Sequence, residues 1–198
     1  MTAIVGPRVF LSASVPLPLR NREYFDSADV VAIRDAIRAL TMVVVEQQAQ
    51  LVFGGHPAIT PMIRLQIAQT GSPIGDHFVI FQSRYFEDFF PQDNSAFQCV
   101  ELVDAVSGNE VASLRHMRET MLASPFVAGV FIGGMEGVEE EYEMFRRLQP
   151  GISAFPIAST GAAANRLFQG DADLIANHPE LRDEISYLSL MRNLISAL

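Results

Sequence analysis

The sequence predicts an α/β protein with a Rossmann-like, open and mainly parallel sheet that carries helices on both faces. Short apolar segments of strand type alternate along the chain with longer segments whose apolar residues recur at helical spacing. Such alternation favours parallel strands with right-handed crossovers, which place helices on both sides of the sheet. The 198 residues, 49% of them apolar, are enough for one well-formed core, so we expect a single domain over 1–198.

The first part of the chain is expected to supply two strands. Residues 9–13 form the first strand, and the Pro-containing stretch 14–25 is predicted as a long loop of the kind that often covers a ligand. Ser27 is expected to cap a helix whose apolar residues keep a spacing of 3.6. Residues 51–53 form the second strand, which ends at two glycines.

Two more strands are expected in the middle of the chain. A helix over 60–70 has Pro in its first turn and is ended by the Gly and Pro of residues 71–73. Residues 77–82 form the third strand. The aromatic-rich region 85–97 is predicted as a loop with a single helical turn, and 97–103 as the fourth strand.

The second half is expected to complete the sheet. A helix over 110–123 leads into a strand at 127–132, a helix follows from Gly137, and 152–158 form the final strand. The segment 181–198 is predicted as a C-terminal helix with an apolar stripe that covers the sheet or a second subunit, and we prefer the sheet. The stripe consists of Leu181, Ile185, Leu188, Met191, Ile195 and Leu198.

Composition excludes several function classes. The net charge of -9 argues against non-specific binding to nucleic acid. All fourteen basic residues are Arg, and the absence of Lys excludes Schiff-base chemistry and a Walker A loop. Cys99 is the single cysteine, which excludes a disulfide framework and a multi-cysteine zinc site, and we expect it to fill the core. We expect no metal and no cofactor.

The chain has no apolar stretch of ~20 residues and no N-terminal segment of signal-peptide type. We therefore expect no contact with a membrane and a cytoplasmic location.

Small and hydroxyl-bearing residues follow four of the predicted strands. Because the carboxyl ends of parallel strands share one edge of the sheet, we expect these loops to meet there. Their N–H groups and hydroxyls suit phosphate and ribose, although a tight turn is the better explanation for any one of these loops alone. Together they predict a nucleotide site made of Ser12, Ala13 and Ser14; Gly54, Gly55 and His56; Gly133, Gly134, Met135, Glu136 and Gly137; and Ser159, Thr160 and Gly161.

The helix that begins near Gly137 carries a run of acids, since four of the six residues from 136 to 141 are Glu. A helix N-terminus after a glycine turn favours an anion. Acids in a first helical turn gain about 0.3–1 kcal/mol each, so solvated side chains explain the run equally well.

Four segments of the sequence resemble, in order, the motifs of the LOG-type phosphoribohydrolases and of the wider SLOG superfamily. The segments are VFLSASVP, LVFGGHPAITPMI, RHMRETML and GGMEGVEEE, and the similarity covers most of the chain to about Ala164. LOG-type enzymes cleave the N-glycosidic bond of a nucleoside 5′-monophosphate. If this chain is an enzyme, the resemblance implies Arg118 and Glu141 as catalytic residues, with the carboxylate stabilising an oxocarbenium-like centre. Arg118 would anchor a phosphate or the ribose, and Arg115, three residues before it, could face the same anion.

Departures from the LOG motifs favour another branch of the superfamily. Gly-Gly-Met replaces Pro-Gly-Gly, Val138 replaces a Thr, and Glu119 replaces a Lys. The lost hydroxyl and cation, with the added acids, weaken the case for a hydrolase. The pattern, LVFGGHPAITP included, is most similar to the SLOG cluster three proteins, which are proposed to sense nucleotide-derived ligands in bacterial conflict systems.

Three hypotheses follow. The preferred one is binding or sensing of a nucleotide-derived ligand at the C-terminal edge of the sheet, in a bacterial conflict or defence system. The alternative is a LOG-type phosphoribohydrolase acting on a nucleoside 5′-monophosphate, and whether the chain is an enzyme is left open. The third is an assembly or scaffold protein with a vestigial pocket. The resemblance also implies a homodimer.

Overall fold

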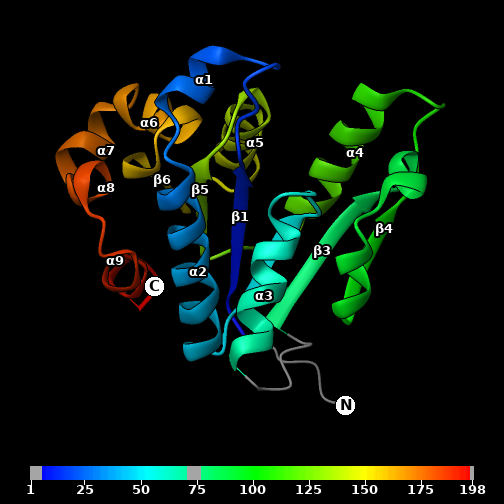
Figure 1. Ribbon diagram of the computed structural model, residues 1–198, viewed down its shortest axis with the longest axis horizontal. Coiled ribbons are helices and arrows are strands. Elements are labelled where there is room, and N and C mark those ends of the chain that lie inside the picture. The colour runs from blue at the N-terminus through cyan, green and yellow to red at the C-terminus, as the bar shows by residue number, and fades with distance from the viewer. Residues whose placement is uncertain (1–5, 71–76, 197–198) are drawn as a thin grey trace.

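The computed structural model describes residues 6–70 and 77–196. Within these ranges, six strands form one sheet in which every pair of neighbours is parallel (Figure 1). This confirms the predicted fold class. The order is β4-β3-β2-β1-β5-β6, with β1 at Arg8–Ser14, β2 at Gln50–Gly54, β3 at Phe78–Ser83, β4 at Cys99–Val103, β5 at Ala128–Gly133 and β6 at Ser153–Ile157.

The direction of the strand order reverses at β1. The chain runs from β1 to β2, β3 and β4 on one side and returns to the other side of β1 with β5. In open parallel sheets a crevice forms at the carboxyl ends of the strands where the order reverses, and ligands bind there. The topology therefore points to the ends of β1 and β5 as the place to look for a site.

Helices cover both faces of the sheet. On one face lie α2 (Val30–Glu46), α3 (Thr60–Thr70) and α9 (Tyr187–Ser196), and on the other lie α4 (Glu110–Leu122) and α5 (Glu136–Leu148) (Figure 1). Side chains of alternate strand residues point to the two faces, so each face has its own apolar cluster. The short helices α6 (Ala162–Gln169), α7 (Ala172–Asn177) and α8 (Glu180–Asp183) follow β6 and its single 3-10 turn, η4 (Ala158–Thr160).

Aromatic packing fixes α5 over the centre of the sheet. The rings of Phe10 on β1 and Phe145 on α5 are stacked with their centroids 5.5 Å apart, and Phe131 on β5 meets both edge-on. A Cβ at Gly129 would lie 2.9 Å from the Phe145 ring, so only glycine lets the ring approach β5 this closely. The N-terminus of α5 is thereby held at the carboxyl edge of the sheet.

Two predictions for residues 14–30 are wrong. The predicted loop contains a short helix, α1 (Arg22–Ser27), which is capped by Asn21. Ser27 does not cap α2, because it is the last residue of α1 and its hydroxyl donates to backbone carbonyls of that helix. Asp29 caps α2 instead, since its carboxylate accepts two N–H groups of the first turn.

The region expected to be a loop with one helical turn contains two 3-10 helices, η2 (Arg84–Phe89) and η3 (Gln92–Ala96). Ser83 caps η2 through the backbone N–H of Tyr85. Two short helices thus form between β3 and β4 where a single turn was predicted.

The C-terminal stripe is interrupted. The described chain forms α8 and α9 with a break between them, where the carboxylate of Glu184 accepts the backbone N–H of Ser186 at 2.6 Å. Ile185, predicted to lie in the stripe, falls in this break and is 75% exposed. Leu181, Met191 and Ile195 are buried in the cluster that contains α2, as expected for a segment that covers the sheet, and Leu188 packs against it. Leu198, Gly71 and Pro73 lie outside the described residues.

Candidate functional site

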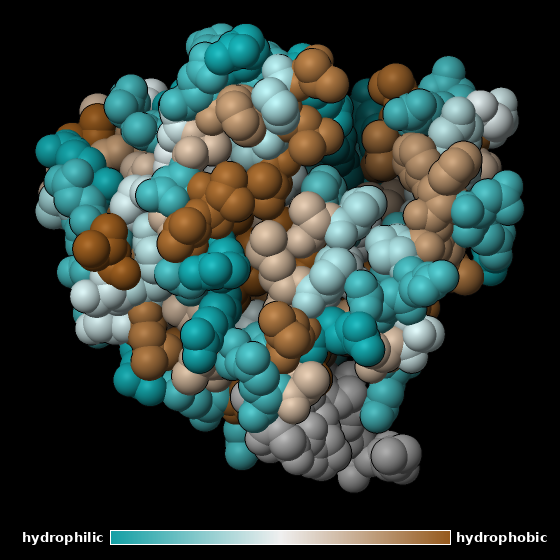
Figure 2. All heavy atoms as spheres, in the orientation of Figure 1, coloured by the Kyte–Doolittle hydropathy of each residue, from teal (hydrophilic) through white to brown (hydrophobic). Residues whose placement is uncertain are grey.

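A pocket of about 340 Å³ lies at the carboxyl ends of β1 and β2, between these strands and the helices α4 and α5. In Figure 2, where this edge is uppermost, the surface is hollowed between the part that carries α1 and the part that carries α4. Residues of three predicted segments line it together with Arg118 and Glu141. The predicted residues in its wall are Ser12, Ala13, Ser14, Gly54, Gly55, His56, Arg118, Met135, Gly137 and Glu141.

Ser12 carries a polar group that the fold leaves without a partner. It follows Phe10 by two residues on β1, so its side chain points to the same face as Phe10, toward α4 and α5. Ser12 is 1% exposed, and its Oγ has no hydrogen-bond partner in the part of the chain that the structure describes. A buried hydroxyl without a partner costs about 1–3 kcal/mol. A group kept at such a cost in a pocket wall is a candidate contact for a ligand.

The N-terminus of α5 opens into the same pocket. Gly133 and Gly134 have φ angles of 56° and 90°, which are left-handed values that favour glycine. The N–H of Gly134 donates to the carbonyl of Ser14 at 2.9 Å, which ties the turn to the end of β1. The N-cap residue, Met135, makes no side-chain hydrogen bond to the first turn. The positive end of the helix dipole therefore faces the pocket without a side-chain cap.

Arg118 on α4 bridges two carboxylates of α5. Its Nε donates to Glu141 Oε1 at 2.9 Å, and its Nη1 donates to Glu140 Oε2 at 2.6 Å. The side chains of Arg118 and Glu141 are 14% and 16% exposed, whereas that of Glu140 is 63% exposed. The single positive charge of Arg118 is thus shared by two negative charges, and the group as a whole is anionic.

His56 lines the pocket as a half-buried imidazole. Its Nδ1 accepts the backbone N–H of Ala58 at 3.1 Å. Burial lowers the pKa of His56, and the nearby charge of Arg20 lowers it further. The ring is therefore neutral at pH 7. A Cβ at Gly55 would lie 1.9 Å from Nε2 of Gln82, so this glycine allows the loop to pass over β3.

The loop at 159–161 does not reach the pocket, and its polar groups are used inside the protein. Thr160 is fully buried, and its Oγ1 accepts the N–H of Gly133 at 2.9 Å and donates to the carbonyl of Ile157. The hydroxyl of Ser159 donates to the carbonyl of Glu184. This loop supports the glycine turn rather than lining the pocket.

Gly161 has a packing role in the same loop. Its φ is 74°, and a Cβ there would lie 1.9 Å from the carbonyl oxygen of Ser27. Glycine at this position lets the end of α1 approach the start of α6.

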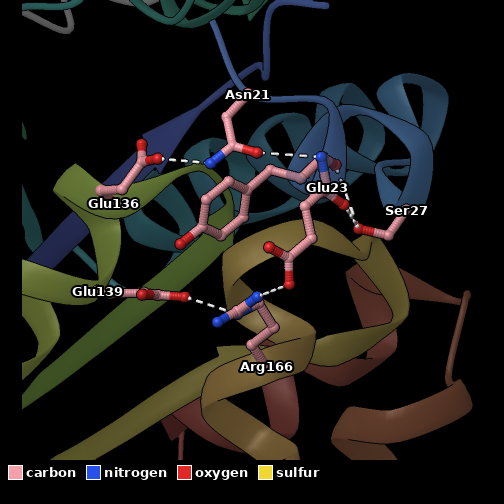
Figure 3. Close-up of polar contacts among 7 residues, drawn as sticks. Asn21, Glu23, Ser27, Glu136, Glu139 and Arg166 are labelled. Atoms are coloured by element: carbon pink, nitrogen blue, oxygen red, sulfur yellow. Dashed lines mark hydrogen bonds and ion pairs between the residues drawn. The ribbon is translucent and has the colours of Figure 1, made fainter.

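Glu136 and the neighbouring Glu139 hold the segment around α1 (Figure 3). Asn21 donates to the carboxylate of Glu136 at 2.8 Å, and this bond is the main cause that lowers the pKa of Glu136. Arg166 of α6 pairs with Glu139 at 3.1 Å and also with Glu23. Burial and a hydrogen bond to Glu139 raise the pKa of Tyr24 to about 12.

Arg115 and Glu136 both lie outside the pocket. They line a neighbouring hollow of about 970 Å³ along the outer side of α5, whose wall also includes Arg118. Arg115 pairs with Glu119 at 3.0 Å on the surface of α4. Glu119, which replaces a Lys of the LOG motif, therefore neutralises Arg115 one helical turn earlier.

Several further residues line the pocket that the sequence did not single out, among them the charged or aromatic side chains of Arg20, Phe86 and Glu110. Arg20 belongs to the stretch that was predicted to cover a ligand, where it follows the apolar run VPLPL. A cation directly after an apolar run was the available signal. Phe86 and Glu110 had no comparable signal.

Within residues 6–70 and 77–196, no cluster of three or more His, Cys, Asp or Glu side chains is suited to hold a metal ion. In the same ranges, every helix is too short or too polar to cross a lipid bilayer.

Comparison with known proteins identifies the family. No curated protein and no solved structure matches the chain. The model of the SLOG cluster3 family matches residues 23–195, which include the lining of the pocket from β2 onward. The chain therefore belongs to the SLOG cluster3 family, a membership that supports a ligand-binding Rossmann-like protein.

Proposed function

We propose that this chain binds or senses a nucleotide-derived ligand in the pocket at the carboxyl ends of β1 and β2. The observation that carries the proposal is the hydroxyl of Ser12, which is buried and unpartnered among the described residues in the wall of that pocket. The pocket volume falls in the usual range of small-molecule sites, roughly 300–1,000 Å³. Family membership supports ligand binding in general, and the nucleotide is our own step.

The pocket offers different chemistry to the two ends of a nucleotide. The first turn of α5, with Met135 and Gly137 at the wall, presents backbone N–H groups and the positive end of a dipole, which suit a phosphate. The anionic group of Arg118 and Glu141 accepts hydrogen bonds from hydroxyls, which suits a ribose. Ser12 can donate or accept between them.

Binding is tested by thermal shift and calorimetry with AMP, ADP, ADP-ribose, cyclic ADP-ribose and adenosine. At least one compound is expected to raise the melting temperature and to give a measurable binding constant. No stabilisation by any member of the panel would end the proposal.

A matched pair of serine variants tests whether the ligand binds beside Ser12. Ser12→Ala removes a hydroxyl that has no partner, so the free protein is expected to unfold at the same denaturant concentration or a higher one. The affinity for the best ligand is expected to fall about fivefold or more, the equivalent of one hydrogen bond. The exposed Ser153 on β6 is the control, because Ser153→Ala is expected to leave both quantities unchanged. Unchanged affinity in Ser12→Ala would move the ligand elsewhere.

A phosphoribohydrolase is the second candidate function, and the adjacency of Arg118 and Glu141 in the pocket favours it. An arginine that donates to a carboxylate orients it toward an oxocarbenium-like centre. AMP and related monophosphates would then release free base. Base release that persists at full rate in Glu141→Gln would remove this assignment, and no base release from any monophosphate would leave binding as the function.

We also propose a role as a sensor in a bacterial conflict or defence system, and assembly into a homodimer, both from the family resemblance. The hollow along α5 supports a contact surface for a second subunit, since it contains charges of both signs beside Val111, which is 76% exposed. Light scattering across a hundredfold range of protein concentration tests the dimer, and a constant monomer mass would refute it.

A further inference from the structure

The pocket wall contains two arginines, and the structure uses them differently. Arg118 already donates to two carboxylates, so an incoming anion would meet a group that is negative overall. Arg20 is exposed at the mouth of the pocket. Its guanidinium has no carboxylate within 4.0 Å in the described part of the chain. Of the two cations, Arg20 is the one that no carboxylate of the described chain holds in an ion pair, so its N–H groups are open to a ligand.

Contacts on both sides of Arg20 fix its place. The backbone N–H groups of Arg20 and Asn21 donate to the carbonyl of Leu17, which closes a turn over 17–21. The side chain of Asn21 bonds to Glu136, the first residue of α5. Figure 3 shows this bond between Asn21 and Glu136. Because Arg20 directly precedes Asn21, it lies beside the N-terminus of α5, the end that has no side-chain cap.

Electrostatics agree with this placement. The positive charge of Arg20 contributes to the lowered pKa of His56 on the β2 side of the pocket. The same charge contributes to the lowered pKa of Glu136 on the α5 side, after the larger effect of Asn21. The guanidinium thus acts on both sides of the pocket mouth.

We propose that Arg20 recognises the anionic group of the ligand together with the N-terminus of α5, so that the pocket selects a phosphorylated nucleotide over the corresponding nucleoside. The inference rests on the proposed function and adds the residue that determines specificity. A guanidinium suits this task because its N–H groups match phosphate oxygens in pairs. The first turn of α5 supplies further N–H donors to the same group.

The test compares AMP, ADP-ribose and adenosine by calorimetry on the full chain. Arg20→Gln is expected to weaken AMP and ADP-ribose about tenfold or more and to change adenosine less than twofold. Arg20→Lys, which keeps the charge, is expected to restore part of the affinity for AMP. Arg38→Gln is the matched control, because Arg38 is an exposed arginine on α2, away from the pocket, and it is expected to bind all three probes as the wild type does.

The outcomes separate the two proposals. If AMP or ADP-ribose binds the wild type and Arg20→Gln binds it as tightly as Arg38→Gln does, Arg20 does not recognise the phosphate and the proposed function stands. Equal losses for AMP and adenosine in Arg20→Gln would also overturn the specificity role. If no probe binds the wild type, the proposed function fails, and this inference fails with it.

Discussion

The ion-pair group of Arg118 allows a quantitative test with an internal control. One guanidinium pairs with two carboxylates at similar distances, 2.9 Å to Glu141 and 2.6 Å to Glu140. The two acids differ in exposure, 16% against 63%. Exposed pairs contribute about 0.2–1 kcal/mol, whereas a hydrogen bond to a charged group that is shielded from water contributes about 1.5–3 kcal/mol. We therefore expect a coupling of about 2 kcal/mol between Arg118 and Glu141, and of about 0.5 kcal/mol between Arg118 and Glu140.

Two double-mutant cycles measure these couplings. Each combines Arg118→Met, which keeps the apolar stem, with Glu141→Gln or with Glu140→Gln, and the free energy of unfolding is obtained from urea titrations. Raising the salt concentration from 50 to about 500 mM is expected to reduce the exposed coupling and to leave the buried one nearly unchanged. Equal couplings, or a larger one for Glu140, would show that burial does not separate the two acids and would remove the physical basis for singling out Glu141.

Two further predictions concern the glycine turn before α5 and the histidine in the pocket wall. Gly134→Ala is expected to destabilise the protein by at least about 1 kcal/mol more than Gly151→Ala. Both glycines have a left-handed φ, but only a Cβ at Gly134 would clash, because it would lie 2.3 Å from Val138. Equal losses of stability in urea unfolding would show that Val138 does not crowd this position. The pKa of His56 is lowered from 6.5 in the folded protein, so the unfolded chain takes up the proton more readily. The contribution of His56 to the free energy of unfolding is therefore full above pH 6.5 and is lost as the pH falls through the folded pKa. His56→Asn can keep the bond to Ala58 but does not titrate in this range. The difference in unfolding free energy between wild type and variant is expected to change with pH below 6.5 and to be constant above it. A difference that stays constant at every pH would refute the lowered pKa.

Much of the fold follows from sequence patterns because its main elements are local. Each of the six strands in the described chain was predicted at nearly its observed place, since short apolar runs between glycine or proline signals need no partner to be recognised. The failures have a different origin. Helix α1 has six residues and a single buried side chain, Tyr24, so no apolar period marks it. Ile185 fits the period of the final helix, yet the hydrogen bond between Glu184 and Ser186 interrupts the helix there.

The lining of the candidate pocket was predicted to the extent that strand ends determine it. The residues at the ends of β1 and β2 and at the start of α5 line one pocket because parallel strands bring them together. The loop at Thr160 follows a strand of the same sheet and has the same composition, but its hydroxyl is consumed by Gly133 and Ile157. Sequence patterns cannot distinguish a hydroxyl that faces a pocket from one that holds a neighbouring turn, because the two differ only in tertiary contacts.

The acids of α5 illustrate the same limit, and they bear on the function. As a run in the sequence they argue against a phosphate at this helix, because four carboxylates would repel it. In the structure each has a partner from another segment: Asn21 for Glu136, Arg166 for Glu139, and Arg118 for the last two. They fasten α1, α4 and α6 around the pocket. Glu136 itself lines the neighbouring hollow along α5 and not the wall of the pocket. A helix can therefore carry these acids and still present its N-terminus to an anion, provided that a cation stands at the mouth, and Arg20 is the residue in that position.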